Sequence, residues 1–294
     1  MKYRMAFIDI DGTLVDSQNR ITDKDKDILK RLDKIHPGFV IVLCTGRTVQ
    51  STMPVIEELG VHTFHVFYDG ALIANPKIRS MLFYQAIDKS LIREAVEFCR
   101  QNGIHLSLYT NGAFWFDEHS ITNNFSHYLD KDVCFTERPN WSDNMQQDFF
   151  HLSPTNVNYD EVIGKTEILK AELLIHSDEE AMQVKEFKEH FGDRFGYSVA
   201  NSPAFPEVDF INLLHPQINK GFAFNKLLNH WGYPSTSIIA IGDGYNDISL
   251  LEKVGMPVAM RNAVPELMQI ADYITDTVEN SGVCKALEFL ISEL

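Results

Sequence analysis

Two hydrophobic patterns alternate along the first 80 residues. Mostly apolar runs of strand length occur at Met5–Ile10, Phe39–Cys44 and Thr63–Tyr68. Such runs are typical of strands that are buried on both faces of a parallel sheet. Between the runs, apolar residues recur at helical spacing, first after the N-cap residue Thr22 and then over Val49–Leu59, which ends at Gly60. The alternation predicts a parallel sheet with right-handed crossovers.

The middle of the chain has a different pattern. Ser90–Asn102 is spaced as an amphipathic helix, and the two strand-like runs that follow it flank Asn111-Gly112. Asn-Gly between two such runs favours a β-hairpin, and therefore an antiparallel pair. A further strand is predicted at Glu172–His176. We interpret residues 84–213 as an α+β unit that is inserted into the α/β chain.

The α/β pattern returns after residue 213. A helix is predicted over Asn219–Trp231, and it is followed by a buried strand at Ser237–Gly242, a helix at Asn246–Val254 and a strand at Met256–Met260. The predicted fold is therefore α/β, with a Rossmann-like parallel-sheet core made of residues 1–83 and 214–294. The inserted α+β unit, residues 84–213, would form a cap on this core.

Charge and hydropathy exclude several kinds of partner. The chain has 26 Lys and Arg against 41 Asp and Glu, a net charge of −15. Binding to nucleic acid or to an anionic membrane surface needs a basic face, so neither partner is expected. No apolar run approaches the roughly 20 residues of a membrane-spanning helix.

The first residues and the cysteines point to the cytoplasm. Asp9 and Asp11 interrupt the first apolar run too early for a signal peptide. The four cysteines form no Cys-x-x-Cys motif, and they lie far apart, at Cys44, Cys99, Cys134 and Cys284. We expect a cytoplasmic protein with reduced thiols that lie mostly in its core.

Four polar motifs follow predicted strands or open a predicted helix. They are Asp9-Ile10-Asp11-Gly12-Thr13-Leu14, Thr45-Gly46-Arg47, Asn219-Lys220-Gly221 and Gly242-Asp243-Gly244-Tyr245-Asn246-Asp247. Ligands of open parallel sheets bind beyond the carboxyl ends of the strands, and the free amides at the start of a helix favour anions. The four motifs are therefore expected to meet at one site, although the sequence separates them widely.

The residue types in these motifs indicate phosphoryl transfer. Four carboxylates that converge on one point need a cation, and carboxylate oxygens suit Mg²⁺. They belong to Asp9, Asp11, Asp243 and Asp247. Lys220 would supply positive charge for a phosphoryl group, and the Thr45 hydroxyl would supply a hydrogen-bond donor. A carboxylate nucleophile, a divalent metal and a lysine together are typical of enzymes that transfer phosphoryl groups.

These motifs resemble those of the haloacid dehalogenase-like hydrolases, and in particular the Cof-type, class IIB sugar-phosphate phosphatases. The resemblance extends over essentially the whole chain, and it includes Gly70-Ala71 and Gly282-Val283 as flanking features. It implies a Rossmann-like core with an α+β cap, Mg²⁺ as the cofactor and a small phosphorylated metabolite as the substrate.

The resemblance also implies a role for each motif residue. Asp9 would be the nucleophile that becomes an aspartyl-phosphate, and Asp11 would be the general acid and base. Residues that would bind the phosphoryl group are Thr45, Gly46, Asn246 and Lys220. Groups that would hold Mg²⁺ are Asp9, the backbone carbonyl of Asp11, Asp243 and Asp247. Asp247 would either bind the ion directly or lie just behind the groups that bind it.

Two positions depart from the family pattern. Asp69 stands in an Asp-Gly-Ala segment where relatives usually have Asn-Gly-Ala, and its charge would weaken the binding of anionic substrates. Arg261 stands where a glycine is usual, and we interpret it as a surface residue rather than a substrate contact. Neither departure falls within the four motifs, so both bear on substrate choice more than on the chemistry.

The predicted function is a Mg²⁺-dependent phosphatase that acts on a small phosphorylated metabolite, such as a sugar phosphate. A phosphomutase or phosphotransferase on the same core is the alternative enzyme, and a receiver-like signalling module is the alternative outside enzymes. Gly164-Lys165-Thr166 lacks the first glycine of a nucleotide-binding P-loop. His62 and His65 have no third metal ligand beside them, so packed or solvated histidines are expected.

Overall fold

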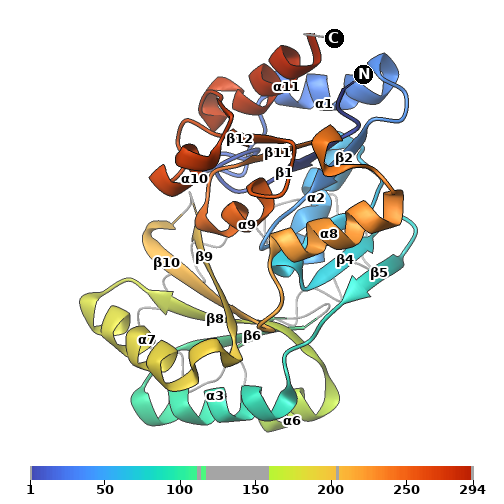
Figure 1. The fold of residues 1–294 in the computed structure, drawn as a ribbon. Coiled ribbons are helices and arrows are strands. Elements are labelled where there is room, and N and C mark those ends of the chain that lie inside the picture. The colour runs from blue at the N-terminus through green and yellow to red at the C-terminus, as the bar shows by residue number, and fades with distance from the viewer. Residues whose placement is uncertain (1, 111–113, 117–158, 203–204, 293–294) are drawn as a thin grey trace.

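A parallel sheet forms the centre of the larger part of the molecule (Figure 1). The computed structural model describes residues 2–110, 114–116, 159–202 and 205–292. The strands of this sheet follow the spatial order β13-β12-β11-β1-β2. They are β1 (Met5–Ile8), β2 (Val40–Leu43), β11 (Ile238–Gly242), β12 (Met256–Ala259) and β13 (Tyr273–Ile274). Because β1 pairs in parallel with both β2 and β11, the loops after these three strands leave the same edge side by side.

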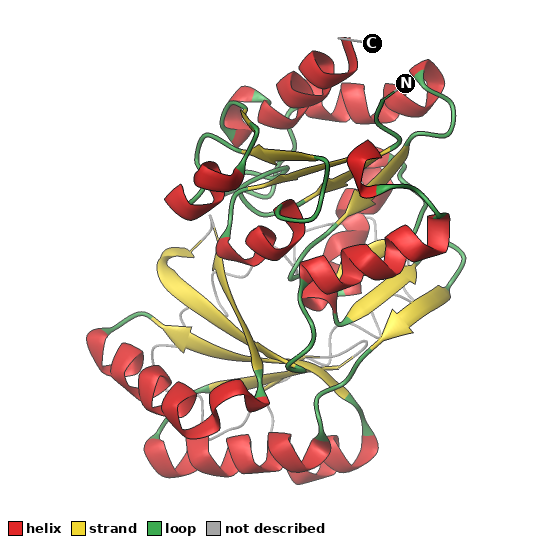
Figure 2. Cartoon of the chain, viewed as in Figure 1, coloured by secondary structure: helices red, strands yellow, loops and turns green. Residues whose placement is uncertain are grey.

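Helices cover both faces of the parallel sheet (Figures 1 and 2). The helices on one face are α1 (Asp23–Ile35), α2 (Val49–Leu59) and α11 (Gly282–Ser292). Those on the other face are α8 (Lys220–Trp231), α9 (Ile248–Leu251) and α10 (Pro265–Ile270). Neighbouring residues of β1 point to opposite faces, so Ile8 packs in the first apolar core and Phe7 in the second. β1, β2, β11 and β12 are mostly buried on both faces, as their apolar runs predicted.

The helix ends follow the signals in the sequence. The Thr22 side chain accepts the Asp25 N–H at the start of α1, and the Asn219 side chain accepts the Phe222 N–H at the start of α8. Gly60 ends α2 with a left-handed φ of 68°. Thr48 caps α2 directly before Val49, and Pro54 lies inside the helix.

The third predicted strand does not become a full member of the parallel sheet. β3 (His65–Phe67) pairs antiparallel with β4 (Leu72–Asn75), which pairs with β5 (Ser80–Tyr84). Only an isolated parallel bridge between Cys44 and Val66 links β3 to the end of β2 among the described residues. The Leu43 N–H donates to Nδ1 of His65 at 3.1 Å, so a side chain takes the place of a backbone acceptor at this junction.

A second, antiparallel sheet lies between β5 and α8 in the sequence. Its spatial order is β7-β6-β8-β10-β9. The strands are β6 (Leu106–Thr110), β7 (Phe114–Phe116), β8 (Ile168–Ile175), β9 (Gly196–Ser202) and β10 (Phe205–Leu214). β6 and β7 pair antiparallel, as the predicted hairpin requires, although its turn at Asn111-Gly112 lies outside the described residues. Residues of this α+β unit are therefore inserted between two parts of the α/β core.

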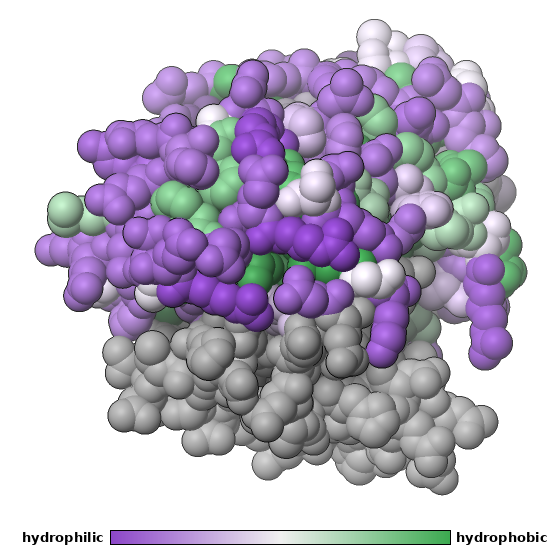
Figure 3. Space-filling view, turned by 90° about the horizontal axis from the view of Figure 1, so that it is seen from below, coloured by the Kyte–Doolittle hydropathy of each residue, from purple (hydrophilic) through white to green (hydrophobic). Residues whose placement is uncertain are grey.

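Three helices cover one face of the second sheet, on the side away from the parallel sheet (Figure 1). They are α3 (Lys89–Asn102), α6 (Tyr159–Lys165) and α7 (Asp178–Phe191). Their apolar residues form a core with the sheet, in which Phe187 and Phe191 are almost fully buried. Seen from the side of these helices, the described surface is mostly hydrophilic, with apolar residues scattered in it (Figure 3).

The opposite face of the second sheet is polar where it meets the core. Ser107, Glu172, Asn212 and Ser198 are register neighbours on four adjacent strands, so they form a row across the sheet. Asn212 and Glu172 are buried, at 1% and 7% exposure. Buried polar groups need hydrogen-bond partners. Asn212 and Ser198 donate to Asp69 of the core, whereas Glu172 accepts from Lys170 and Tyr109 within the second sheet.

Three of the four cysteines lie in the described part of the chain. Cys44, Cys99 and Cys284 are buried free thiols, whereas Cys134 lies outside the described residues. Within the described part of the chain, no helix is both long and apolar enough to cross a membrane.

Candidate active site

The four motifs meet at the carboxyl edge of β11, β1 and β2. Asp9 and Asp11 follow β1, Thr45 follows β2, and Asp243 follows β11. Lys220 is the first residue of α8, and its Nζ lies 2.6 Å from Oδ1 of Asp9. The sequence separates these two residues by 211 positions, so the strand order of the sheet brings them together, as the motif analysis predicted.

Lys220 is a fully buried ammonium group between two carboxylates. Its Nζ donates to Asp9 Oδ1 and also, at 2.7 Å, to Asp247 Oδ1. Burial disfavours the charged form, but the carboxylates of Asp247 and Asp9 outweigh it and raise the pKa of Lys220 well above its ordinary value. Lys220 is therefore a permanent positive charge at the centre of the site.

One lysine does not balance the carboxylates around it. Carboxylate oxygens of Asp9, Asp243 and Asp247 all lie within 4.8 Å of one another. Burial and the nearby Asp247 and Asp243 carboxylates raise the pKa of Asp9, against the opposing effect of Lys220. Burial and Asp247 likewise raise the pKa of Asp243 to about 7. A cluster of oxygen donors with excess negative charge fits a hard divalent cation such as Mg²⁺.

Neighbouring residues fix Asp243 in this cluster. The Thr13 hydroxyl donates to Asp243 Oδ1 at 2.7 Å, and Asn262 donates from Nδ2 to the Gly12 carbonyl at 2.8 Å. Gly12 has a φ of 77°, and a β-carbon there would lie 2.2 Å from Asp243 Oδ2. A glycine is thus required at position 12, both for the backbone conformation and for the close approach of Asp243.

Asp247 already uses both of its carboxylate oxygens within the protein. Oδ1 accepts from Lys220, and Oδ2 accepts the backbone N–H groups of Asp243 and Gly244, each at 3.1 Å. The side chain therefore holds the loop after β11 in shape and orients Lys220. Asp9 and Asp243 are the carboxylates of the cluster that are better placed to bind a cation directly.

Asp11 lies beside this cluster and pairs with Arg47. Arg47 donates from Nε to Asp11 Oδ2 at 2.8 Å and from a terminal nitrogen to Oδ1 at 2.5 Å. Partial burial opposes ionisation, but the charge and hydrogen bonds of Arg47 outweigh it and lower the pKa of Asp11. In this arrangement the pairing with Arg47 favours the ionised form of Asp11.

The other predicted phosphate-binding residues surround the same point. Thr45 is fully buried, and its hydroxyl accepts the Arg47 N–H at 3.1 Å. The Gly46 carbonyl accepts from Lys170 of β8 at 3.3 Å, and Asn246 donates from Nδ2 to Asp69 Oδ1 at 2.9 Å. The structure thus gathers the predicted site residues along this edge of the sheet, and it connects several of them to residues outside the motifs.

Sequence reasoning missed several residues that hold the site together. Arg47 and Thr13 stand inside the motifs without an assigned role, and Asn262 stands in the segment after β12. The sequence signal that could have identified them is their position shortly after strands that end at this edge of the parallel sheet. Lys170 has no such signal, because the pairing of β8 with β6 and β10 places it here.

The two departures from the family pattern have different surroundings. Asp69 is 1% exposed and lies inside the site, where Asn246 contacts it. The side chain of Arg261 is 68% exposed, and its Nε lies 3.8 Å from Asp276. The interpretation of Arg261 as a surface residue is therefore confirmed.

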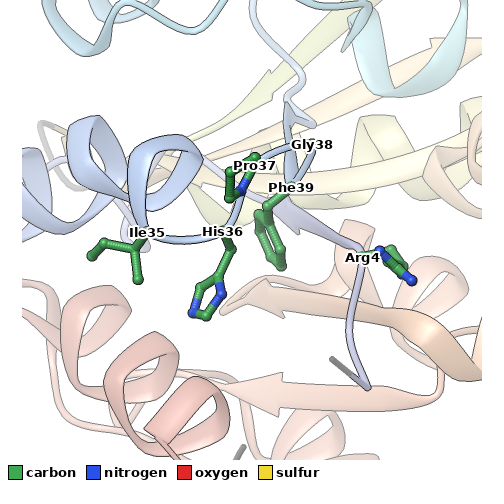
Figure 4. Close-up of a pocket in the computed structure, with 6 residues that line it drawn as sticks. All are labelled: Arg4, Ile35, His36, Pro37, Gly38 and Phe39. Carbon is green, nitrogen blue, oxygen red and sulfur yellow. The ribbon is translucent and has the colours of Figure 1, made fainter.

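Other candidate signals do not form a second site. His65 is fully buried, and burial lowers its pKa to about 4, so it is a packed neutral histidine as expected. A small pocket lies at the amino ends of β1 and β2, at the end of the sheet opposite the motifs (Figure 4). Its lining residues are Arg4, Ile35, His36, Pro37, Gly38 and Phe39. This pocket contains none of the chemistry-bearing residues.

Comparison with known proteins gives consistent similarities over the whole chain. Residues 6–287 match the sequence profile of a family described as haloacid dehalogenase-like hydrolase. A phosphatase of Bacillus subtilis is 25% identical over 297 residues, which cover 98% of this chain and 100% of the relative. A 5-amino-6-(5-phospho-D-ribitylamino)uracil phosphatase of the same organism is 24% identical over 282 residues, 96% of this chain and 95% of the relative.

Solved structures share the fold. A sugar phosphatase described as haloacid dehalogenase subclass IIB superposes with a TM-score of 0.74 at 20% sequence identity, and the match covers 98% of each chain. The likeness includes the inserted α+β unit as well as the parallel-sheet core, because both chains are matched nearly in full.

Proposed function

Because the chain belongs to the haloacid dehalogenase-like hydrolases, we propose that it is a Mg²⁺-dependent phosphatase that forms an aspartyl-phosphate on Asp9. Its substrate would be a small phosphorylated metabolite, a sugar phosphate or a similar phosphomonoester. The observation that carries the proposal is the buried Lys220 ammonium between Asp9 and Asp247, beside the further carboxylate of Asp243. The relative that is named a ribitylaminouracil phosphatase supports a phosphorylated small molecule as the substrate class.

The residues present fit a magnesium ion. Asp9, Asp243 and the backbone carbonyl of Asp11 would hold it, while Asp247 would orient Lys220 and the loop after β11. When bound, Mg²⁺ would neutralise negative charge on the carboxylates and on the phosphoryl oxygens, so that two anionic groups can approach each other. All other steps are assigned to side chains of the protein.

In the first step, Asp9 attacks the phosphorus atom. Lys220 engages Oδ1 of Asp9, so Oδ2 is the oxygen that we assign to the attack. The new Oδ2–P bond forms as the bond from phosphorus to the leaving oxygen breaks, and Asp11 donates a proton to that oxygen. Thr45, Gly46 and Asn246 would hold the phosphoryl oxygens. Arg47 must first release Asp11, or share its hydrogen bonds with the substrate, because the Arg47 pairing keeps Asp11 ionised.

In the second step, water hydrolyses the aspartyl-phosphate. Asp11, now ionised, accepts a proton from the water as its oxygen attacks phosphorus. The Oδ2–P bond breaks, and inorganic phosphate and the free carboxylate of Asp9 are formed. Asp11 therefore ends the cycle protonated and ready for the next leaving group.

We assign residues 1–83 and 214–294 to the catalytic core and residues 84–213 to a cap that determines specificity. The phosphoryl group is the same in every candidate substrate, so discrimination must come from contacts to the leaving group. The Lys170 contact to the Gly46 carbonyl supports this assignment, because it places a cap side chain against the phosphate-binding loop. A chimera with another relative's cap should change the preferred substrate and keep the need for Asp9 and Mg²⁺.

A phosphate-release assay tests the proposed function. The purified chain, with Mg²⁺, is incubated with a panel of phosphorylated sugars, cofactors and nucleotides, and inorganic phosphate is measured with and without a chelator. Release that depends on Mg²⁺ supports a phosphatase. If the substrate were isomerised, or its phosphoryl group moved to another acceptor, without release of inorganic phosphate, the chain would be a phosphomutase or a phosphotransferase. A long-lived phosphorylated Asp9 would indicate a receiver-like module.

A further inference from the structure

Asp69 is a buried carboxylate at the place where the core and the second sheet meet. It lies in the turn after β3, Tyr68–Gly70, with a left-handed φ of 51° and 1% exposure. Its backbone N–H donates to the Thr45 carbonyl at 3.0 Å, which ties its position to the phosphate-binding loop. The same carboxylate approaches Gly46 so closely that a β-carbon there would lie 3.1 Å from both of its oxygens.

Three donors from distant segments converge on this carboxylate. Asn246, in the loop after β11, donates to Oδ1 at 2.9 Å. Asn212 of β10 and Ser198 of β9 donate to Oδ2 at 2.8 Å and 2.9 Å. One oxygen therefore faces the catalytic loop and the other faces the second sheet, so a single planar group joins the two.

The contact with Asp69 holds the Asn212 amide in an orientation that costs free energy. Asn212 points its Nδ2 at the carboxylate, and its Oδ1 is buried with no hydrogen-bond partner in the described structure. An unpaired buried acceptor costs on the order of 1–3 kcal/mol. Reversing the Asn212 amide would turn its oxygen toward the carboxylate and place two acceptors face to face. The interaction with Asp69 is therefore favourable enough to keep another polar atom unsatisfied.

The geometry points to Asp69 as a positioning residue, a proposal that rests on the proposed function. We infer that Asp69 orients the Asn246 amide for the phosphoryl group and couples this orientation to the seating of β9 and β10 on the core. An amide nitrogen has two hydrogens; Asp69 accepts one and thereby fixes the amide plane, which leaves the second for a phosphoryl oxygen. When β9 and β10 are displaced, Oδ2 loses both donors and the carboxylate no longer has a fixed position.

Two substitutions separate hydrogen bonding from charge. Asp69→Gly removes the carboxylate without placing a β-carbon at a left-handed φ, and we expect kcat/KM to fall about 10- to 100-fold. Asp69→Asn should retain activity within about threefold of wild type. Its oxygen can still accept from Asn246, and its NH₂ group can donate to the Asn212 oxygen once that amide has reversed. A loss in Asp69→Asn as large as in Asp69→Gly would overturn the hydrogen-bonding role.

A double-mutant cycle tests whether Asp69 acts through Asn246. On an Asn246→Ala background, Asp69→Gly should lower kcat/KM by less than about threefold, because the group that it orients is already absent. If the double variant instead lost kcat/KM by the full product of the two single-variant losses, Asp69 would not act through Asn246. Thr275→Val is the matched control, since it removes a buried hydrogen bond to the Gly282 carbonyl away from the site. It should leave kcat/KM unchanged.

Hydrogen exchange tests the coupling without any substrate. In Asp69→Gly, amide exchange should rise together in residues 196–200 of β9 and in residues 244–247, and it should stay at the wild-type level in Asp69→Asn and Thr275→Val. A rise in only one of the two segments, or in neither, would overturn the coupling. If the wild-type chain hydrolyses no phosphomonoester, the proposed function fails, while the exchange experiment still decides whether Asp69 joins the two segments.

Discussion

Two buried lysines, one in the core and one in the second sheet, differ in how many carboxylates surround them. Lys220 is fully buried and donates to two carboxylates, Asp9 at 2.6 Å and Asp247 at 2.7 Å. Lys170 is 5% exposed and donates to one carboxylate, Glu172 at 3.1 Å, and to the Gly46 carbonyl at 3.3 Å. Its ammonium also lies 4.3 Å from the centre of the Tyr109 ring.

The difference separates a cluster with an excess of carboxylates from a balanced ion pair. Lys170 and Glu172 balance each other, and the Tyr109 hydroxyl donates to the second Glu172 oxygen at 2.7 Å, so this pair is electrically neutral and well hydrogen-bonded. Lys220 faces an excess of carboxylates, which a further cation would neutralise. Lys220 is therefore suited to a site that binds charge, and Lys170 to holding the Gly46 loop against the second sheet.

The largest effect is expected at Asp9, the carboxylate of the Lys220 cluster that we propose as the nucleophile. Asp9→Asn should lower kcat by about 10⁴-fold or more, roughly 5 kcal/mol of barrier, because an amide is a poor nucleophile. Phosphate release under saturating substrate and Mg²⁺ measures this loss. The exposed Asp27→Asn is the matched control and should retain full activity. A variant of Asp9 with more than about a hundredth of the wild-type kcat would place the nucleophile elsewhere.

The two lysines should also differ in their effect on stability. Lys220→Met leaves Asp9 and Asp247 buried without their counter-charge, so the free energy of unfolding should fall by about 3–5 kcal/mol at neutral pH. Lys170→Met leaves only Glu172, which keeps the Tyr109 hydrogen bond, and we expect a smaller loss of about 1–3 kcal/mol. Urea unfolding measures both values.

Magnesium should distinguish these two variants. Several millimolar Mg²⁺ should recover part of the stability of Lys220→Met, because a cation at Asp9 and Asp243 replaces some of the missing charge, and it should not stabilise Lys170→Met beyond the wild-type response. Equal recovery in both variants would mean that the ion does not bind at the Lys220 cluster.

A smaller effect on activity is expected from Lys170. Lys170→Met removes the hydrogen bond to the Gly46 carbonyl, and kcat/KM should fall by up to about tenfold, roughly 1.4 kcal/mol, because the loop that carries Thr45 is held less firmly. Steady-state kinetics with the substrate found in the panel measures the loss. Lys188→Met, on α7 and remote from the loop, is the matched control. A loss beyond a hundredfold would assign Lys170 a direct contact with the reacting groups rather than with the loop.

The parallel-sheet core and its motifs were largely predictable from local sequence. The apolar runs of β1, β2 and β11 and the caps at Thr22 and Asn219 have the predicted positions because each depends on neighbouring residues alone. The position of the site followed from one topological rule, that loops at the carboxyl ends of parallel strands share an edge.

Contacts between segments that do not follow from local sequence patterns could not be predicted. The spacing of apolar residues contains no sign of the antiparallel pairing of β3 with β4, nor of the hydrogen bond from the Leu43 N–H to His65. The contacts of Lys170 to Gly46 and of Asp69 to Asn212 require the register of the second sheet against the core. The pairing of Arg47 with Asp11 was not predicted either, because motif spacing does not reveal a contact between side chains that are 36 positions apart.

His65 sharpens the comparison as a third buried basic side chain. Burial, without the carboxylates that surround Lys220, lowers its pKa to about 4, whereas Lys220 has a raised pKa. The unfolded chain therefore binds a proton at this histidine near pH 6.5, and the folded chain does so only near pH 4. Its contribution to stability is complete above pH 6.5 and is progressively lost as the pH falls toward 4. Between pH 6.5 and 5.5 the free energy of unfolding should fall by about 1 kcal/mol through this group.

His65→Asn keeps an acceptor for the Leu43 N–H and removes the titration, so urea unfolding across this range should show a flatter pH dependence in the variant. The exposed His62→Asn should retain the wild-type dependence. If His65→Asn and the wild type lost stability in parallel, His65 would be charged in the folded protein, and burial alone would not explain the contrast with Lys220.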